Sequence, residues 1–459
     1  MPAPQTTRRS MIALSNEEAN ITKAHGADPD TAGFLLGDNC QNYHKQNDLR
    51  VGRESVINVG MAGLYFEAAD VDPAVFDLAD KWKRIAQGLR KSVTVDNLLE
   101  LIDSANSELV GSLMIVEALA RLIPSLYSLR AEIHLRRGAT ATHVHPATQD
   151  VVHPLASNGK KEMIPVELKD GMLDFAGQIG QTSTQFLKRK LPVGGDGLTY
   201  AMLLQLQIYL QFHNDPFQSF EIFEPQLQVW HTKWTDIIRI FQTHWGRTSG
   251  RSTNPASLGY SAGKIGRAAR SNMKKVEFYQ GSQLLNTAKM LPDMETLLPM
   301  VRKLYRAYAT ARGRDHALYN VGETSEWANM VPAGSVWTPA EIEDSSIDKK
   351  PKKTKATEKQ PKNPRKPKKK PPPKQYDGDF VLAQEIDFIR DTMNSRKLAT
   401  AVAEGDIGRL YECIKYMLFT FGGSSHTNYL GYLLETVMNL EFESSPGLKW
   451  ALLRGLVGI

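Results

Sequence analysis

The chain has 459 residues, of which 41% are hydrophobic and 23% are charged, a composition typical of a globular protein with two or three domain-sized parts. Two cysteines, Cys40 and Cys413, are too few for a disulfide framework or a zinc cluster, which indicates a reducing compartment. The N-terminal residues lack an apolar core and the long apolar stretches are interrupted by charge, so we expect a soluble intracellular protein without a secretory signal or membrane span.

The net charge of +6 is concentrated in two segments. Residues Lys349–Lys374 hold twelve lysines and one arginine against one glutamate, and residues Gly246–Val276 hold seven basic residues and no acid. The remainder of the chain is therefore acidic, and its overall basicity says little about the folded core.

The first third of the chain predicts a small sheet followed by helices. Residues 1–30 are expected to be a flexible N-terminal segment, and residues 31–340 an α/β core. Residues 34–36 predict a short strand that leads into an aspartate, and residues 55–66 predict one or two more strands. Apolar residues at spacings of three and four then predict a helical insertion over residues 81–136.

The rest of the chain predicts mainly helices. Helical periodicity recurs within residues 163–180, 200–212, 225–245 and 294–312. The Lys/Pro-rich residues 341–378 cannot bury a core, so we expect a disordered basic linker there. Residues 379–459 predict a C-terminal helical part of the same core, and the chain stops within an apolar pattern as if truncated. The fold class expected is α+β, mostly helical, with a small sheet.

Two apolar runs each end on an aspartate in a tight turn. One is Gly33–Asn39, which contains Asp38, and the other is Leu191–Gly197, which contains Asp196. Strands that deliver carboxylates to their exposed ends build two-metal phosphoryl-transfer sites, because a rigid sheet fixes the acids that hold the cations. The alternative is that both aspartates are ordinary turn residues whose side chains bond nearby backbone.

The two basic segments suggest binding to nucleic acid. A dense Lys/Pro run is typical of nuclear import signals and of contacts to the phosphate backbone, although it can also be a plain solvated linker. In residues 246–276 the basic residues lie among Gly, Ser and Asn, which suits a DNA backbone, with a mobile surface loop as the alternative. The candidate nucleic-acid-binding residues are Arg247, Arg251, Lys264, Arg267, Arg270, Lys274 and Lys275.

Histidines near residue 150 offer a weaker signal. His143, His145 and His153 lie close in sequence to Asp150, and these residue types can ligate zinc. The prolines between them indicate a loop, and a His-x-His pattern alone more often has a structural role.

Several motifs together resemble a domain of unknown function that is abundant in mushroom-forming fungi. The motifs, which cover most of residues 33–459 in the same order, are Gly37–Tyr43 with Asp48–Glu54, Val193–Tyr200, Trp230–Asp236, and Gly422–Tyr429 with Leu434 and Glu435. The family's layout looks transposon-derived, and the Lys/Pro segment looks like an insertion in this copy.

The layout is similar to the ribonuclease-H-like core of cut-and-paste transposases. In that core one aspartate leaves the first strand, a second leaves the fourth, and a glutamate comes from a later helix; the three hold Mg²⁺ ions that activate a nucleophile and stabilise the leaving oxygen. The resemblance implies Asp38 and Asp196 as catalytic metal ligands and Glu435 as the third catalytic acid, with Glu441 and Glu443 as rivals. His231 would occupy the position of a helical histidine found after the second aspartate in some transposases.

The implied function is a Mg²⁺-dependent transposase or nuclease acting on DNA in the nucleus, although a decayed element can keep the fold after losing activity. The alternative is a non-catalytic nuclear protein that associates with nucleic acid or acts as a scaffold. Both aspartates must converge for catalysis, because carboxylates more than about 10 Å apart could not share a cation pair.

Overall fold

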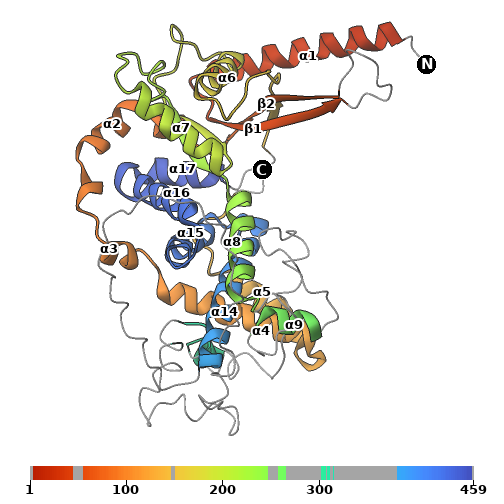
Figure 1. Ribbon diagram of the computed structural model, residues 1–459, viewed down its shortest axis with the longest axis vertical. Coiled ribbons are helices and arrows are strands. Elements are labelled where there is room, and N and C mark those ends of the chain that lie inside the picture. The colour runs from red at the N-terminus through yellow and green to blue at the C-terminus, as the bar shows by residue number, and fades with distance from the viewer. Residues whose placement is uncertain are drawn as a thin grey trace, which may run out of the picture. The chain divides into compact units, whose positions relative to one another are not determined.

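The computed structural model describes residues 4–44, 55–145, 150–246, 257–264, 301–306, 308–310, 314 and 380–456. These residues fall into two compact units. The first contains the described residues up to Thr243 and from Thr392 onward, and it holds helices around a small mixed sheet of five strands (Figure 1). The mostly helical α+β prediction is confirmed.

The sheet has the strand order β3-β2-β1-β4-β5. Its central strand β1 pairs antiparallel with β2 on one side and parallel with β4 on the other; β3 is antiparallel to β2, and β5 is parallel to β4. The strands are β1 (Gly33–His44), β2 (Val56–Glu67), β3 (Val152–Pro154), β4 (Leu191–Gly195) and β5 (Phe223–Leu227). The parallel strands β1, β4 and β5 therefore direct their C-terminal ends to one edge of the sheet.

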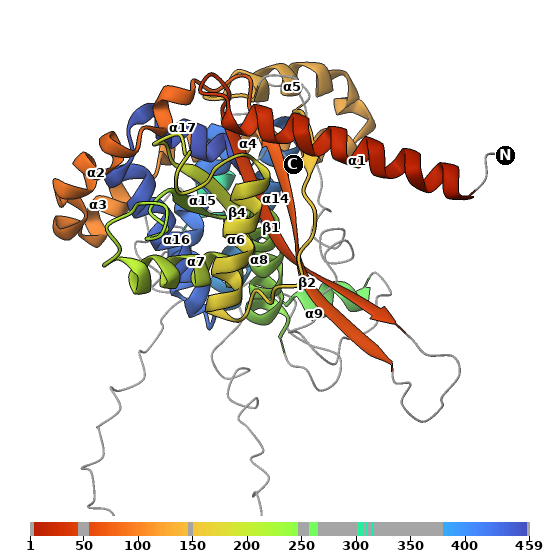
Figure 2. The same cartoon turned by 90° about the horizontal axis from the view of Figure 1, so that it is seen from above.

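The sequence underestimated this sheet. β1 does not end before Asp38 but continues to His44, paired with β2 along its length, and the far part of this pair forms a two-stranded ribbon (Figure 2). β5 was missed because its central Pro225 weakens a strand pattern. Since β5 is an edge strand, a proline is tolerated there.

Helices connect and cover the strands. Those of the first unit are α1 (Pro4–Ala27), α2 (Leu78–Ala86), α3 (Val95–Glu100), α4 (Ser104–Leu122), α5 (Arg130–Gly138), α6 (Pro165–Gln178), α7 (Gly197–Leu210), α8 (Val229–His244), α15 (Ile407–Gly422), α16 (Thr427–Met438) and α17 (Pro446–Gly455), with α8 ending at the boundary of the second unit. Short turns of 3-10 helix lie at η1 (Pro73–Phe76), η2 (Leu89–Ser92) and η3 (Pro124–Leu129), and a π-helical turn η4 at Asn439–Glu443.

One segment differs from the sequence expectation. Residues 1–30 were expected to be flexible, whereas the structure has the helix α1 over most of them.

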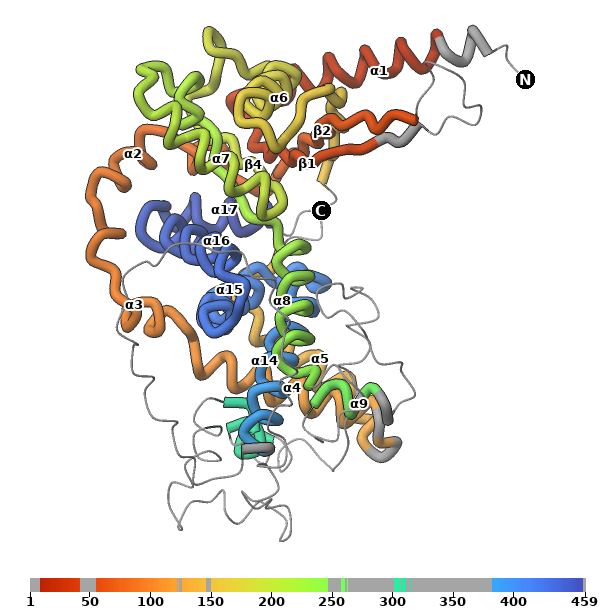
Figure 3. Tube along the Cα trace, viewed as in Figure 1, coloured from red at the N-terminus to blue at the C-terminus, as the bar shows by residue number. Residues whose placement is uncertain are grey.

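The segment between β2 and β3, where a helical insertion was expected, contains several separate helices, which Figure 3 traces from α2 through α3 to α4. Thr94 caps α3 in a reciprocal capping box, and Asp103 caps α4, so two N-terminal caps divide the periodic pattern.

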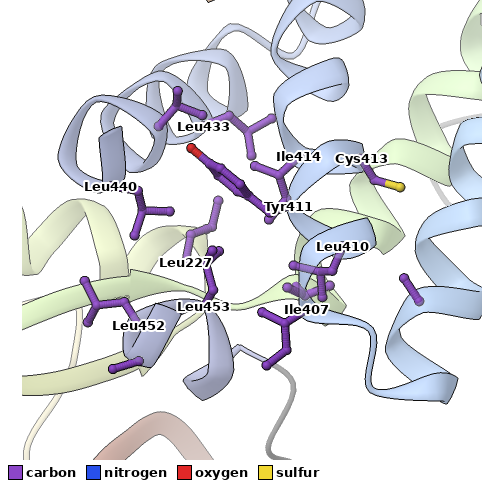
Figure 4. Close-up of a cluster of buried hydrophobic side chains, with 14 of the residues drawn as sticks. Leu227, Ile407, Leu410, Tyr411, Cys413, Ile414, Leu433, Leu440, Leu452 and Leu453 are labelled. Carbon is purple, nitrogen blue, oxygen red and sulfur yellow. The ribbon is translucent and has the colours of Figure 1, made fainter. Parts of the chain in front are cut away.

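The sheet is covered on both faces. On one face Leu35 of β1 and Val193 of β4 pack with the apolar side of α6 and α7. On the other, Phe34 and Leu36 of β1 join a larger cluster supplied by α15, α16 and α17. Figure 4 shows part of this second cluster, where Leu227 meets side chains of those C-terminal helices. Adjacent residues of one strand thus serve two cores, as the two-residue period of a strand requires.

The second unit is described over shorter stretches. It includes α9 (Leu258–Lys264) and the first part of α14 (Phe380–Glu404), where Asp387 forms ion pairs with Arg314 and Arg390 at 2.9 and 2.7 Å. The Lys/Pro-rich residues 341–378 lie outside the described residues. Within the described part of the chain, the helices are too short or too polar to span a bilayer.

Candidate active site

The register between β1 and β4 brings the two motif aspartates to the same place on the sheet. Leu36 of β1 pairs with Gly194 of the parallel strand β4, and Asp38 and Asp196 each stand two residues farther along. Neighbouring strands lie about 4.8 Å apart, so equivalent residues on parallel strands are neighbours across the sheet. The two aspartates therefore occupy equivalent positions at the C-terminal edge of β4.

Close packing explains the glycines beside Asp196. A Cβ atom on Gly195 would lie 2.5 Å from the Cβ atom of Thr199, and one on Gly197 would lie 3.2 Å from the hydroxyl of Tyr429. Separations below 3.0 Å require the surroundings to shift, so a side chain at position 195 would displace the first turn of α7. The Gly-Gly-Asp-Gly motif thus lets β4 turn directly into α7 with the aspartate at the junction.

Both aspartates make the local bonds that a turn residue makes. Asp196 is the N-cap of α7, and its Oδ1 accepts from the backbone N–H groups of Leu198 and Thr199 at 2.8 Å each. Asp38 is exposed, and its Oδ1 accepts from the backbone N–H of Asn39 at 2.8 Å. Among the described contacts these bonds use one oxygen of each carboxylate, so the geometry is compatible with both the turn interpretation and a ligand role.

A third acid, Glu162, lies between them. It comes from the loop before α6 and is only 2% exposed. The Asn39 side chain donates to its Oε2 at 3.0 Å, and the Thr199 hydroxyl contacts its Oε1 while lying 3.1 Å from Oδ1 of Asp196. Glu162 is therefore tied to the neighbours of both aspartates, one on β1 and one on α7.

The charges of both aspartates act on Glu162. Burial raises the pKa of Glu162, and the negative charges of Asp196 and Asp38 raise it further, whereas the Asn39 hydrogen bond opposes the shift. Among the described residues Glu162 forms no ion pair with a lysine or arginine. Glu162 is therefore a carboxyl that burial first, and then two other carboxylates, push toward its neutral form, and such shifted acids are common at functional sites.

Glu435, expected as the third catalytic acid, has a different environment. Arg90 donates to both of its oxygens, at 2.7 and 3.1 Å, and its Nε also forms an ion pair with Glu443 at 2.9 Å. Glu441 accepts from the hydroxyl of Tyr411 at 2.7 Å and from Lys449 at 2.8 Å. The structure thus gives each of the three sequence candidates a charged or hydroxyl donor, and it puts Glu162 with the aspartates instead.

Aromatic residues also reach this edge of the sheet. The backbone N–H of Gln228 donates to Gly195 O, which fixes the start of α8 beside the end of β4. His231 lies in the first turn of α8, with its ring 4.7 Å from that of Trp230, and Trp230 is 50% exposed. His231 is therefore on the same sheet edge as Asp196, where the resemblance expected a histidine.

One family comparison matches most of the chain. The Family of unknown function (DUF6589) matches residues 88–290 and 286–457. The chain belongs to this family. Comparison with curated proteins gave no match, and comparison with solved structures gave none either.

Membership in DUF6589 assigns no chemistry, because the family's function is unknown. The matched residues include Glu162, Asp196 and Glu435, whereas Asp38 precedes them. Any chemistry of this DUF6589 protein must therefore be inferred from the geometry at the sheet edge.

The histidines near residue 150 do not form one site. His153 lies in β3 between Glu18 and Glu67, at 2.7 and 2.6 Å, and the His143 ring stacks on Trp450 at 3.4 Å. The ligating atoms of His145, Asp70 and Asp150 do lie within 4.8 Å of one another.

The positively charged side chain of Arg454 already lies beside Asp70 and Asp150. The guanidinium of Arg454 bonds Asp70 at 2.7 Å and also bonds Asp150, whose Oδ2 accepts at 2.8 Å. The described geometry therefore favours an ion-pair cluster around the buried Arg454 over a zinc site.

The predicted nucleic-acid-binding residues fall almost entirely outside the described residues. Only Lys264 has a described backbone, at the end of α9. The remaining ones are Arg247, Arg251, Arg267, Arg270, Lys274 and Lys275.

Sequence reasoning missed Glu162 for an identifiable reason. It sits in a polar loop after Lys160 and Lys161, without a motif or periodic pattern around it. Only the packing of that loop against β1 and α7 buries the side chain beside two other acids. The one available signal was an acid shortly before the proline that begins α6, which is too common to single out.

Proposed function

We propose that this protein is a transposon-derived enzyme with a ribonuclease-H-like core that performs Mg²⁺-dependent phosphoryl transfer on DNA. The catalytic group would be Asp38, Asp196 and Glu162, with Glu162 taking the role first expected of Glu435. The observation that carries the proposal is the convergence of three carboxylates at one edge of β1 and β4.

The sheet supports the comparison with a ribonuclease-H-like core. The strand order is β3-β2-β1-β4-β5, and β2 alone is antiparallel to the other strands. Asp38 lies on the central strand β1, and Asp196 directly follows β4. That is the layout implied by the sequence resemblance. The helices α2 to α5 enter as an insertion between β2 and β3, which accounts for the long separation of the two aspartates in the chain.

The donor set suits Mg²⁺. Carboxylate oxygens are the ligands that this hard cation prefers, and Glu162 is a buried acid without a described cationic partner. A bound Mg²⁺ pair would activate a water or 3′-hydroxyl and stabilise the leaving oxygen of the phosphodiester. The chain's own contribution is to fix the ligands: β1 and the α7 cap hold the aspartates, and Asn39 and Thr199 orient Glu162.

The proposal is tested by metal binding and DNA cleavage in matched variants. Mg²⁺ or Mn²⁺ should raise the melting temperature of the wild type and support nicking of plasmid DNA. Asp196→Asn and Asp38→Asn should abolish both effects, because asparagine keeps the helix cap but cannot supply the charge. Asp103→Asn is the matched control, since Asp103 caps α4 through the same kind of bond. Equal metal-induced shifts in all three variants would contradict the proposal.

DNA association is proposed from the charge distribution. Basic residues of 246–276 and 349–374 should bind duplex DNA without sequence preference and with strong salt dependence. Deleting 349–374 and neutralising 246–276 should weaken binding and flatten its dependence on salt. The same deletion should move a fluorescent fusion out of the nucleus, if the Lys/Pro run is an import signal. Unchanged affinity and location would remove these two claims.

A second candidate is a non-catalytic nuclear protein that binds nucleic acid or acts as a scaffold. The observation that favours it is the use of both aspartates in local backbone bonds, as a helix cap and as a turn. This candidate predicts DNA binding that is indifferent to Mg²⁺ and to Asp196→Asn.

A further inference from the structure

An arginine-lined cavity lies away from the sheet edge, in the helical insertion. Its volume is about 280 Å³, and it is lined by Glu117, Arg121, Arg130, Ile133, His134 and Arg137. We call it the arginine cavity. Its walls come from the C-terminal part of α4 and from α5, so it shares no residue with the proposed catalytic group.

One carboxylate serves two guanidinium groups on the floor of this cavity. Arg121 contacts Oε1 of Glu117 at 2.5 Å, and Arg137 bonds the other oxygen and also reaches Glu404. Burial by itself raises the pKa of Glu117, but the two guanidinium groups lower it below its usual range. Glu117 is therefore an ionised acid whose charge is already shared.

Two further arginines add charge without adding an acid. Arg130 places its guanidinium 4.1 Å from the ring centre of Tyr127 and donates from Nε to Ala120 O at 3.0 Å. Burial lowers the pKa of Arg396, Arg121 and Arg137 add to that effect, and the charge of Glu117 opposes it. Within the described part of the chain, neither Arg130 nor Arg396 forms an ion pair at contact distance.

The balance of charge around the arginine cavity is therefore positive. Arg121 and Arg137 share Glu117, and Arg137 and Arg409 share Glu404, while Arg130 adds a guanidinium group without a described ion pair. Bringing guanidinium groups together without matching acids is unfavourable. An anion in the cavity would remove that repulsion.

We propose that the arginine cavity is a binding site for phosphate groups. Guanidinium forks match phosphate oxygens in two-point hydrogen bonds, and Arg121, Arg130 and His134 are exposed at the cavity while Arg137 is buried below them. The phosphate comes either from a nucleic-acid backbone or from a small phosphorylated molecule, and both present the same oxygens to the arginines.

The test is pyrophosphate binding by the full-length protein, measured by calorimetry in low salt with EDTA. Arg130→Gln and Arg121→Gln should each weaken binding about tenfold or more, since each removes a charge-assisted contact. Arg136→Gln is the matched control: it changes the net charge equally on α5, but Arg136 pairs with Glu132 and does not line the cavity. The control should bind within about twofold of the wild type.

Two results would overturn the proposal. One is a wild type that does not bind pyrophosphate, and the other is equal weakening in Arg130→Gln and Arg136→Gln, which would reflect nonspecific attraction to basic segments. Competition distinguishes the sources: displacement of pyrophosphate by a short DNA duplex supports a backbone phosphate, and its absence supports a small ligand. Asp38→Asn/Asp196→Asn should bind pyrophosphate normally, so failure of the catalytic proposal would leave this site intact.

Discussion

Glu162 and Glu224 are both buried, with 2% and 3% exposed, but the charged groups around them have opposite signs. Glu224 of β5 lies 3.3 Å from Lys81 and 3.0 Å from Lys190. Burial raises the pKa of Glu224 on its own, but the two lysines lower it to about 2. Burial also lowers the pKa of Lys81, which Glu224 only partly offsets.

Glu162 is buried to the same degree without a described lysine or arginine, and the nearby charges are the two aspartates. The comparison separates two uses of a buried acid. Where the fold supplies the cations, the acid joins elements together, as Glu224 joins β5 to α2. Where the fold supplies more acids, the acid is pushed toward its neutral form, and the proposed Mg²⁺ would come from outside.

The largest effect is expected at Glu224. Glu224→Gln leaves Lys81 and Lys190 buried without a counter-charge, so it should reduce the free energy of unfolding by about 3–5 kcal/mol. Urea unfolding followed by circular dichroism measures this. Glu435→Gln is the control, because its pair with Arg90 is one-third exposed and should contribute at most about 1 kcal/mol. Similar losses in the two variants would remove the distinction between a buried network and a surface pair.

The pH dependence of stability should differ in sign between the two glutamates. The pKa of Glu224 is lower in the folded state, so its stabilisation is present above about 4.5 and is lost as the pH falls toward 2. The pKa of Glu162 is raised in the folded state, so its stabilisation is present below about 4.5 and is lost as the pH rises through the folded value.

The test is to measure the free energy of unfolding between pH 3 and 8 for the wild type, Glu224→Gln and Glu162→Gln. The deficit of Glu224→Gln should shrink toward low pH, and Glu162→Gln should gain relative to the wild type toward high pH. Parallel profiles for the two variants would contradict the comparison.

At neutral pH Glu162→Gln should change stability by less than about 1 kcal/mol, in either direction, because it removes both a hydrogen-bond acceptor and a carboxylate crowded by two others. It should nevertheless weaken the Mg²⁺-induced rise in melting temperature, measured by differential scanning fluorimetry. A Mg²⁺ response that survives in Glu162→Gln would exclude this residue as a ligand.

The smallest effect concerns the two cysteines, because one is buried in the core and the other is partly exposed on β1. Cys413 is fully buried, and burial raises the pKa of its thiol to about 11, whereas Cys40 on β1 is partly exposed. A disulfide reagent at pH 8 should therefore modify one thiol rapidly in the native protein and two after denaturation. Two rapidly reacting thiols would show that the α15 core opens easily.

The sequence predicted local features well where they depend only on neighbouring residues, as turns and periodic helices do. The Gly-Gly-Asp-Gly turn after β4 and the periodic apolar residues of α7 were both recognisable, and the structure has a strand and a capped helix there. It predicted poorly where tertiary contacts decide. β5 contains a proline and was missed, and its pairing with β4 exists because an edge strand tolerates that residue.

The sequence by itself determined the α+β class, the location of the basic charge and the two aspartates as candidates, because composition, periodicity and turn chemistry act over a few residues. The tertiary structure decided which acids lie near one another. It set Asp38 level with Asp196 through strand register, buried Glu162 beside them, and paired Glu435 with Arg90. Electrostatic coupling depends on separation in space, and residues far apart in the chain acquire that separation only when the sheet and its helices have packed.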